Sequence, residues 1–308
     1  MKMIREYRPD AIWSTFPIAT AHRIAAELHR RSKIPWIADF RDPMAQDGYP
    51  QDPIVWAQYK AIEENAMVNA SYCTFTTPTA TLSHQNRYAF AADRIRLLEN
   101  GYDEESFASV EAGANSEPLN PGALTLLHSG IVYPEERDPT QLFEALRSLK
   151  DKGLVAAGSL RIRFRAAVQV ELLRRLASQH GVGEFIEVMP SISYKPALAE
   201  MLRADALLVM QGSNCNEQVP AKVYEYIRAN RPIVCLADPA GDTATVLRNS
   251  GIKLVARLDS VTEIEGALMR LLSPGNKSYQ QVPTGSAVQQ ASRRQRSKGL
   301  AALLDSIK

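Results

Sequence analysis

Short apolar runs alternate with longer amphipathic segments over most of the 308-residue chain. An apolar run of four to eight residues is typical of a buried strand, and a longer segment with apolar residues along one side is typical of a surface helix. In the first block, strands are predicted at 11–16, 35–40, 71–76 and 94–99, and helices at 19–31, 54–69 and 79–91. This alternation predicts a parallel sheet with helices on its faces.

A second alternating block begins at residue 124. Its predicted strands lie at 124–128, 161–166, 185–189, 205–210, 233–236 and 253–256, and its predicted helices at 140–150, 168–180, 195–203, 221–229, 243–249 and 261–272. Six strands with intervening helices predict a complete Rossmann-like domain. After a Pro/Gly/Ser-rich loop at 274–284, a final helix is predicted at 289–307.

The predicted fold class is therefore α/β, with two Rossmann-like domains. Residues 108–122 are rich in small residues, proline and asparagine and show no apolar periodicity, so they predict a linker. We expect a first domain at 1–107, a second at 123–285, and a carboxy-terminal helix at 286–308 that packs back toward the first domain.

Residues 211–234 combine a strand end, a polar loop, a helix start and two spaced carboxylates. Pro220 suits the first turn of a helix, and ligands of open α/β sheets bind where strands end and helices begin. Glu217 and Glu225 can accept hydrogen bonds from sugar hydroxyls, while Lys222 offers a cation to phosphate. Spacing alone is equally typical of a solvated helix face with ordinary charges.

This stretch resembles the donor-site signature of retaining nucleotide-sugar glycosyltransferases of family 4, where two glutamates flank a helix start and a Pro-Ile or Pro-Val strand follows. The run VPAKVYEY resembles the PxKxxEY form common in enzymes that build bacterial surface polysaccharides. The resemblance implies that Glu217 contacts the transferred sugar and Glu225 the nucleotide ribose. It also places Asn216 and Lys222 among the donor-binding residues.

His128-Ser129-Gly130 ends the first predicted strand of the second block, and Arg137 follows. A glycine allows close backbone approach to a diphosphate, and an arginine can bind phosphate oxygens through two hydrogen bonds. The stretch resembles the family's glycine loop, with Arg137 in place of a lysine. Ile131 stands where the family has an arginine, so one phosphate cation of the pattern is missing. The resemblance implies that Gly130 and Arg137 contact the diphosphate.

Arg41 and Asp42 follow the buried strand at 35–40, where they form a candidate catalytic or acceptor site. Many family members carry a histidine in this region. A structural salt bridge between Arg41 and Asp42 is the alternative interpretation.

The resemblance implies the two-domain GT-B architecture, and the Asn100-Gly101-x-Asp103 run with Phe107 resembles the exit from its first domain. That domain has more strands in the family, and a glycine loop, so we expect its start to be absent here. A truncated gene product, a fragment and an enzyme completed by a partner all remain open. The strand at 11–16 would then be an exposed edge that favours a homodimer.

Composition, charge and missing motifs narrow the functional classes, the compartment and the cofactors to be expected. A net charge of +2 is too small to indicate nucleic-acid binding, although basic clusters at 29–33 and 293–296 suit peripheral contact with an anionic membrane. Three scattered cysteines, the lack of an 18-residue apolar run and a polar start favour a cytoplasmic protein. The sequence has no G-x-G-x-x-G run, P-loop, DxD motif or metal-like cluster, so we expect neither a nicotinamide cofactor nor a metal.

We therefore expect a retaining transferase that moves a hexosyl group from a nucleotide diphosphate sugar to a saccharide or lipid-linked acceptor in surface glycan synthesis. A nucleotide-sugar epimerase of the same fold and a non-catalytic nucleotide-sugar binding fragment remain the alternatives.

Overall fold

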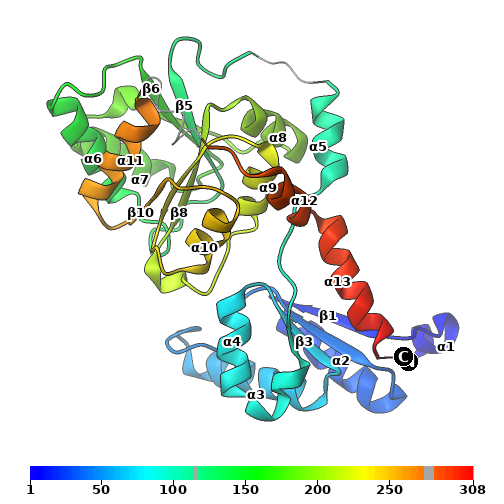
Figure 1. Cartoon of the computed structure of the whole chain (residues 1–308). Coiled ribbons are helices and arrows are strands. Elements are labelled where there is room, and N and C mark those ends of the chain that lie inside the picture. The colour runs from blue at the N-terminus through cyan, green and yellow to red at the C-terminus, as the bar shows by residue number, and fades with distance from the viewer. Residues whose placement is uncertain (114–116, 274–280, 308) are drawn as a thin grey trace. The chain divides into compact units, whose positions relative to one another are not determined.

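The computed structural model describes residues 1–113, 117–273 and 281–307 of the chain. These residues form two compact units, Met1–Asn100 together with Gln295–Lys308, and Gly101–Arg294. Each unit contains one parallel sheet (Figure 1).

The second unit contains a six-stranded sheet in the order β10-β9-β8-β5-β6-β7. Every neighbouring pair is parallel. The chain builds β5, β6 and β7 outward in one direction and then returns to add β8, β9 and β10 on the other side. The reversal lies between β5 and β8, which is where ligands bind in sheets of this topology. The strands are β5 Leu124–Ser129, β6 Leu160–Arg165, β7 Ile186–Met189, β8 Ala206–Gln211, β9 Ile233–Ala237 and β10 Val255–Ala256.

Helices cover both faces of this sheet (Figure 1). One apolar core joins the strands to α6 Thr140–Asp151, α7 Val170–Gln179 and α11 Val261–Leu272. The opposite core joins them to α5 Glu104–Glu111, α8 Tyr194–Arg203, α9 Lys222–Ala229 and α10 Asp242–Asn249. All six residues of β8 are buried, because a central strand is covered on both faces. Burial on both faces explains why residues 205–210 are almost all apolar.

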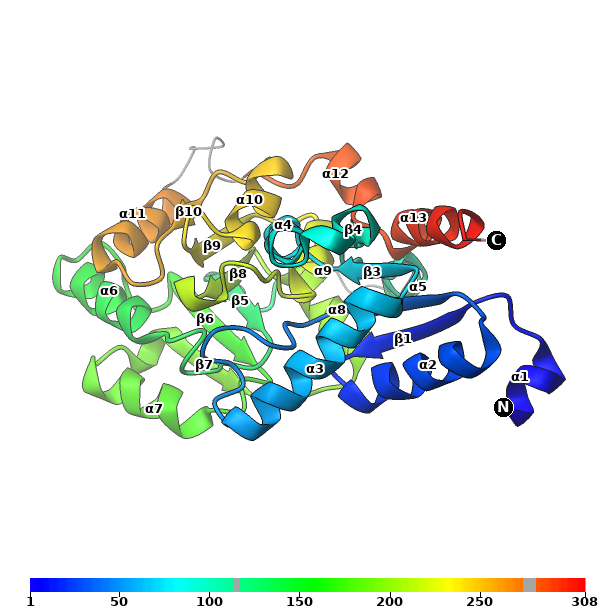
Figure 2. The ribbon, with the colours of Figure 1, turned by 90° about the horizontal axis from the view of Figure 1, so that it is seen from below.

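The first unit has a four-stranded parallel sheet in the order β1-β2-β3-β4, formed by Ile12–Phe16, Trp36–Phe40, Tyr72–Phe75 and Ile95–Leu97. Its connections are α2 Ala19–Ser32, α3 Pro53–Asn69, and α4 Pro78–Arg87 followed by the 3-10 helix η1 Ala89–Arg94. The helices α2 and α3 pack side by side (Figure 2). A short helix, α1 Lys2–Tyr7, precedes β1.

Among the described strands β1 pairs only with β2, so it is an edge strand, as predicted, and the side chain of Trp13 is 39% exposed. Dimerisation through this edge stays a prediction.

The strands and helices agree with the sequence pattern to within a few residues, but the boundaries between units differ. Residues 104–111, partly inside the predicted linker, form α5, because Asp103 caps its first turn and Phe107 and Val110 are buried in the core of the second unit. The change of unit falls after Asn100 instead of after Phe107. Most of the predicted loop at 274–284 lies outside the described residues.

The predicted final helix is divided in two. Gly285–Gln290 forms α12 and Arg293–Asp305 forms α13, with Tyr102 bridging to Ser292 at the break. Residues from Gln295 onward group with the first unit.

Candidate functional site

The candidate site of the second unit begins where β5 and β8 end side by side, at Ser129 and Gln211. Because all six strands are parallel, the loops that follow β5, β8 and β9 leave the sheet at the same edge. The structure therefore brings Gly130, Arg137, Asn216 and Glu217 to one edge of one sheet.

Backbone bonds hold the glycine after β5 while leaving space beside it. The Gly130 N–H donates to the carbonyl of Arg165 over 2.9 Å. The Ser129 N–H donates to the hydroxyl of buried Tyr226 over 2.8 Å. A Cβ atom added to Gly130 would meet nothing closer than Nε2 of His128, at 4.0 Å. A ligand therefore has room to approach this backbone.

Arg137 curls back over its own loop. Its Nη1 donates to the carbonyl of Ile131 over 3.0 Å, and its guanidinium lies 5.2 Å from the ring centre of Tyr133. The backbone N–H of Arg137 also donates to the carbonyl of Tyr133, which fixes the turn. These contacts place a partly buried guanidinium beside the end of β5, with further N–H groups that can bind an anion.

The end of β5 is bonded directly to α9, because Tyr226, which accepts from the Ser129 N–H, lies on that helix. His128, the residue before Ser129, is buried, and Nδ1 of His128 is 3.1 Å from the carbonyl of Leu208. Burial is the main cause that lowers the pKa of His128 to about 4, with smaller contributions from the positive charges of Arg137 and Lys222. The loop after β5 and the helix that begins with Lys222 therefore lie next to each other.

The loop after β8 is locked to the loop after β5. The Gly212 N–H donates to the carbonyl of Glu136 over 2.5 Å, and Nδ2 of Asn214 donates to the carbonyl of Glu135 over 2.9 Å. A Cβ atom at Gly212 would lie 2.7 Å from Oδ1 of Asn214 and 3.0 Å from the Glu136 carbonyl oxygen. A larger residue here would force Asn214 to turn away and crowd the Glu136 carbonyl, so the close packing of the two loops favours glycine. Sequence reasoning assigned no role to Gly212 or Asn214, although a glycine directly after a buried strand was the available signal.

Asn216 joins the same loop to the end of β9. Its Nδ2 donates to Asp238 over 2.7 Å, and its carbonyl accepts from the Asp242 N–H over 2.9 Å. A Cβ atom at Gly241 would come within 2.7 Å of Oδ1 of Asn216. These contacts give Asn216 a structural role, so its predicted contact with the donor stays a prediction.

Glu217 lies, partly exposed, between the short 3-10 helix η3 Ser213–Cys215 and α9. The turn around it is held because the Gln218 N–H donates to the carbonyl of Cys215 and Oγ1 of Thr243 donates to the carbonyl of Gln218. Its contact with a sugar stays a prediction.

Glu225 and Lys222 bind each other. Nζ of Lys222 lies 2.8 Å from Oε2 of Glu225, whose other oxygen accepts a 3.0 Å hydrogen bond from the hydroxyl of Tyr194 on α8. The Glu225 side chain is only 13% exposed. Burial, followed by the negative charge of Glu225, raises the pKa of Tyr194 to about 12, so the phenol keeps its proton. Sequence reasoning treated Lys222 and Glu225 as separate contacts and missed Tyr194, which lies on another helix.

Arg41 and Asp42 belong to the first unit and follow β2. Arg41 donates to Asp39 over 3.3 Å, to the carbonyl of Leu98 over 3.2 Å, and to the side chain of Asn100. The carboxylate of Asp39 also accepts a bond from Thr74 over 2.7 Å. The partner of Arg41 is therefore Asp39, in place of the Asp42 considered from the sequence.

The Asp42 residue is exposed, but nearby protein atoms partly desolvate its carboxyl group and raise the pKa of that group. The positive charge of Arg41 partly offsets this rise in the pKa.

Over residues 1–113, 117–273 and 281–307 we find no group of three or more His, Cys, Asp or Glu side chains arranged to hold a metal ion. No helix in these ranges combines the length and the apolar character needed to cross a membrane.

The same fold occurs in solved structures of low sequence identity. HepE from Anabaena, crystallised with UDP and glucose, has a TM-score of 0.72 at 13% identity, and the match covers 99% of this chain and 80% of that chain. A trehalose 6-phosphate synthase from Burkholderia multivorans has a TM-score of 0.72 at 15% identity, covering 99% and 72%. The sucrose-phosphate synthase of Thermosynechococcus elongatus has a TM-score of 0.71 at 11% identity, covering 99% and 75%.

The chain has the GT-B fold. This confirms the predicted α/β class with two Rossmann-like domains. No protein-family model matches the chain, and no curated protein matches it either. Within the GT-B fold, the edge that holds Gly130, Arg137, Lys222 and Glu225 is the ligand-binding edge expected from topology alone.

Proposed function

We propose that this protein is a retaining glycosyltransferase that moves a hexosyl group from a nucleotide diphosphate sugar to a saccharide or lipid-linked acceptor in surface glycan synthesis. The observation that carries the proposal is the bond from the Ser129 N–H, at the end of β5, to Tyr226 on α9, which joins the loop that holds Gly130 and Arg137 to the helix that holds Lys222 and Glu225 at the topological reversal of the sheet. HepE, which shares the fold, was crystallised with UDP and glucose.

The chemistry requires charge stabilisation above all. As the bond from the sugar to the diphosphate breaks, negative charge grows on the leaving phosphate and positive charge on the sugar ring. Arg137, Lys222 and the backbone beside Gly130 would stabilise the phosphate charge without a metal ion. Glu217 would contact the sugar, Glu225 would accept hydrogen bonds from the ribose, and Asn216 would line the donor site.

In this arrangement Lys222 exchanges partners. In the structure the charge of Lys222 is compensated by Glu225, at 2.8 Å. A diphosphate would draw Nζ of Lys222 away and leave the Glu225 carboxylate to the ribose hydroxyls and Tyr194. The ion pair thus keeps two otherwise unpaired charges satisfied until the donor arrives.

We assign the two residues of the first unit different roles. Arg41 fixes the ends of β2 and β4 through Asp39, Leu98 and Asn100, so it acts as a positioning residue. Asp42 is an exposed carboxylate with a raised pKa, and it is the candidate group for the acceptor side. We assign no general base, because the leaving phosphate itself can accept the acceptor proton.

The test combines binding with product analysis on the full chain. Calorimetry with UDP, GDP and dTDP identifies the base, and incubation with the matching nucleotide sugars then shows what is formed. Slow donor hydrolysis, with faster turnover when an acceptor is added, supports a transferase. An isomeric nucleotide sugar supports an epimerase, binding without chemistry supports a binding module, and the absence of nucleotide binding overturns the proposal.

A further inference from the structure

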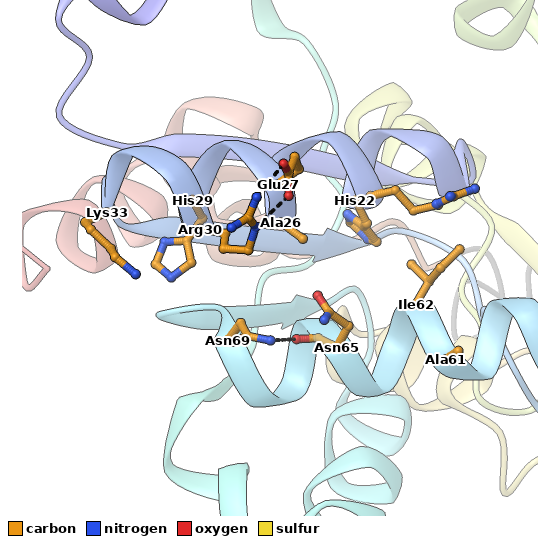
Figure 3. Close-up of a pocket in the computed structure, with 11 residues that line it drawn as sticks. His22, Ala26, Glu27, His29, Arg30, Lys33, Ala61, Ile62, Asn65 and Asn69 are labelled. Atoms are coloured by element: carbon orange, nitrogen blue, oxygen red, sulfur yellow. Dashed lines mark hydrogen bonds and ion pairs between the residues drawn. The ribbon is translucent and has the colours of Figure 1, made fainter. Parts of the chain in front are cut away.

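A basic cavity of about 400 Å³ lies between α2 and α3 of the first unit. Ala26 on α2 and Ala61 on α3 line it, and their small side chains leave the space between the two helices unfilled. His29, Arg30 and Lys33 extend from α2 over the space, while Asn65 and Asn69 extend from α3 below it (Figure 3).

The cavity lies away from the candidate site described above for this unit. Lys33 and Asn69 come just before β2 and β3, whereas Asp42 comes just after β2. In a parallel sheet these positions mark opposite edges, so this end of the cavity lies at the amino ends of the strands. The other end, at His22 and Arg23 in the first turns of α2, extends toward the carboxyl ends, but neither Arg41 nor Asp42 is among the lining residues.

The lining concentrates positive charge. It includes Arg23, Arg30 and Lys33 but a single carboxylate, that of Glu27. Both oxygens of Glu27 are bound by Arg30, over 2.7 and 2.8 Å, and Arg31 contacts the same group. These two arginines lower the pKa of Glu27 to about 2, so its carboxylate stays ionised and is already bound by both of them. Arg23 and Lys33 form no ion pair with any described residue.

His22 adds a buried donor to the wall. The indole N–H of Trp36 donates to Oγ of Ser14 over 2.7 Å, and Oγ of Ser14 lies 2.7 Å from Nδ1 of His22. When the Ser14 hydroxyl donates its hydrogen bond to Nδ1, the ring proton of the neutral imidazole resides on Nε2. Nε2 of His22 is buried and has no hydrogen-bond partner among the described residues.

We propose that this cavity binds the phosphate group of a small ligand. Lys33 and Arg23 supply charge that no ion pair compensates, and Asn65 and Asn69 supply amide groups on the opposite side, where Asn69 also donates to the Asn65 carbonyl. His22 lines the cavity and holds a buried Nε2 without a described partner behind its surface. Charge-assisted bonds to phosphate oxygens are the strongest that such side chains form. A soluble phosphate ester and the headgroup of an anionic lipid present the same chemistry.

Three variants test the proposal in the full-length chain. Lys33→Gln removes an exposed cation of the lining, and Ala26→Leu fills the space. Arg31→Gln removes one positive charge from the same helix at a residue outside the lining, and Glu27 keeps both of its bonds to Arg30, so this variant controls for surface charge. The probes are inorganic phosphate and glycerol 3-phosphate, measured by calorimetry with saturating UDP so that the second unit does not contribute. Co-sedimentation with phosphatidylglycerol and phosphatidylcholine vesicles tests the lipid source.

We expect Lys33→Gln to weaken binding of a free phosphate about tenfold, as loss of one charge-assisted bond does, and Arg31→Gln to change it less than twofold. Binding to phosphatidylglycerol vesicles alone, lost in Lys33→Gln and Ala26→Leu but kept in Arg31→Gln, supports the site with a headgroup as its ligand. Equal losses in Lys33→Gln and Arg31→Gln would show a general effect of surface charge and overturn the proposal. So would the absence of binding to every probe. If Ala26→Leu does not fold, the two charge variants decide the matter.

Discussion

Nζ of Lys222 lies 2.8 Å from Oε2 of Glu225, one turn along the same helix. In the sequence these residues appear as two separate ligand contacts, a cation for phosphate and a carboxylate for ribose. In the folded chain each satisfies the other, and Tyr194 holds the second oxygen of Glu225. A nucleotide diphosphate bound as proposed would have to replace this ion pair, and the first two predictions test the residues that the exchange involves.

Glu225→Ala should weaken binding of the nucleoside diphosphate by about 1.5–3 kcal/mol, because charge-assisted hydrogen bonds to the ribose are lost. Calorimetry on the folded variant measures the loss. Tyr194→Phe is the control, because it keeps the ring and removes only the hydroxyl that donates to Glu225; its effect should be smaller. Unchanged affinity in Glu225→Ala would remove the ribose assignment.

Arg137→Ala and Lys222→Ala should each weaken binding of the nucleoside diphosphate more than binding of the bare nucleoside. The reason is that the loop that holds Arg137 and the helix that holds Lys222 meet where the Ser129 N–H donates to Tyr226, so we expect both cations to reach the same phosphate groups. Arg147→Ala on the exposed face of α6, where Arg147 pairs only with Asp151, controls for the loss of one charge. Equal losses for both ligands would indicate damage to the fold in place of a lost phosphate contact.

Substitution by alanine should affect stability at one glycine of the site and ligand binding at another. Gly212→Ala should lower the free energy of unfolding by about 1–3 kcal/mol, because the new Cβ atom would crowd Asn214 and the Glu136 carbonyl. Gly130→Ala should leave stability nearly unchanged but weaken nucleotide binding, since its Cβ atom would enter open space beside the phosphate loop. Urea unfolding and calorimetry on both variants check this, and equal stability losses would contradict the packing described here.

Stability should fall as the pH drops from about 6.5 to about 4. Burial lowers the pKa values of His22 and His128 from the ordinary 6.5 to about 4. In this window the unfolded chain binds protons that the folded chain excludes, so the stabilisation is complete above pH 6.5 and is lost on acidification. Each histidine contributes a slope of at most about 1.4 kcal/mol per pH unit.

Urea unfolding at several pH values measures this dependence. His128→Gln should reduce the slope between pH 4 and 6.5 relative to the unchanged chain. An identical slope in the variant would mean that His128 has the same pKa in the folded and the unfolded chain.

The alternation of apolar runs and amphipathic segments was sufficient to predict all ten strands described here and most of the helices. Strands covered on both faces need continuous apolar residues, as β8 has, and surface helices need one apolar side, so burial leaves a local trace in the sequence. The helix α5 was missed because Phe107 and Val110, its two buried side chains, fall where small and polar residues suggested a linker.

The candidate site was predictable only in part. Gly130, Arg137, Glu217, Lys222 and Glu225 were predicted because they follow strand ends or begin a helix and because their stretches resemble the family 4 signature, and their contacts with a donor stay predictions. The role of Gly212 could not be predicted, because it depends on the Glu136 carbonyl, which is distant in the sequence. The role of Tyr194 could not be predicted either, because this residue reaches Glu225 from another helix.

By itself the sequence determined the fold class, the order of strands and helices, and which loops meet at the carboxyl edge of the sheet, since these follow from periodicity and from parallel topology. Only the tertiary structure decided which charges are already paired. Arg41 turns to Asp39, Leu98 and Asn100 and not to Asp42, and Lys222 turns to Glu225, because side-chain direction depends on the neighbours that packing supplies. The basic cavity between α2 and α3 arises in the same way, since two alanines on different helices create a space only once the helices lie side by side.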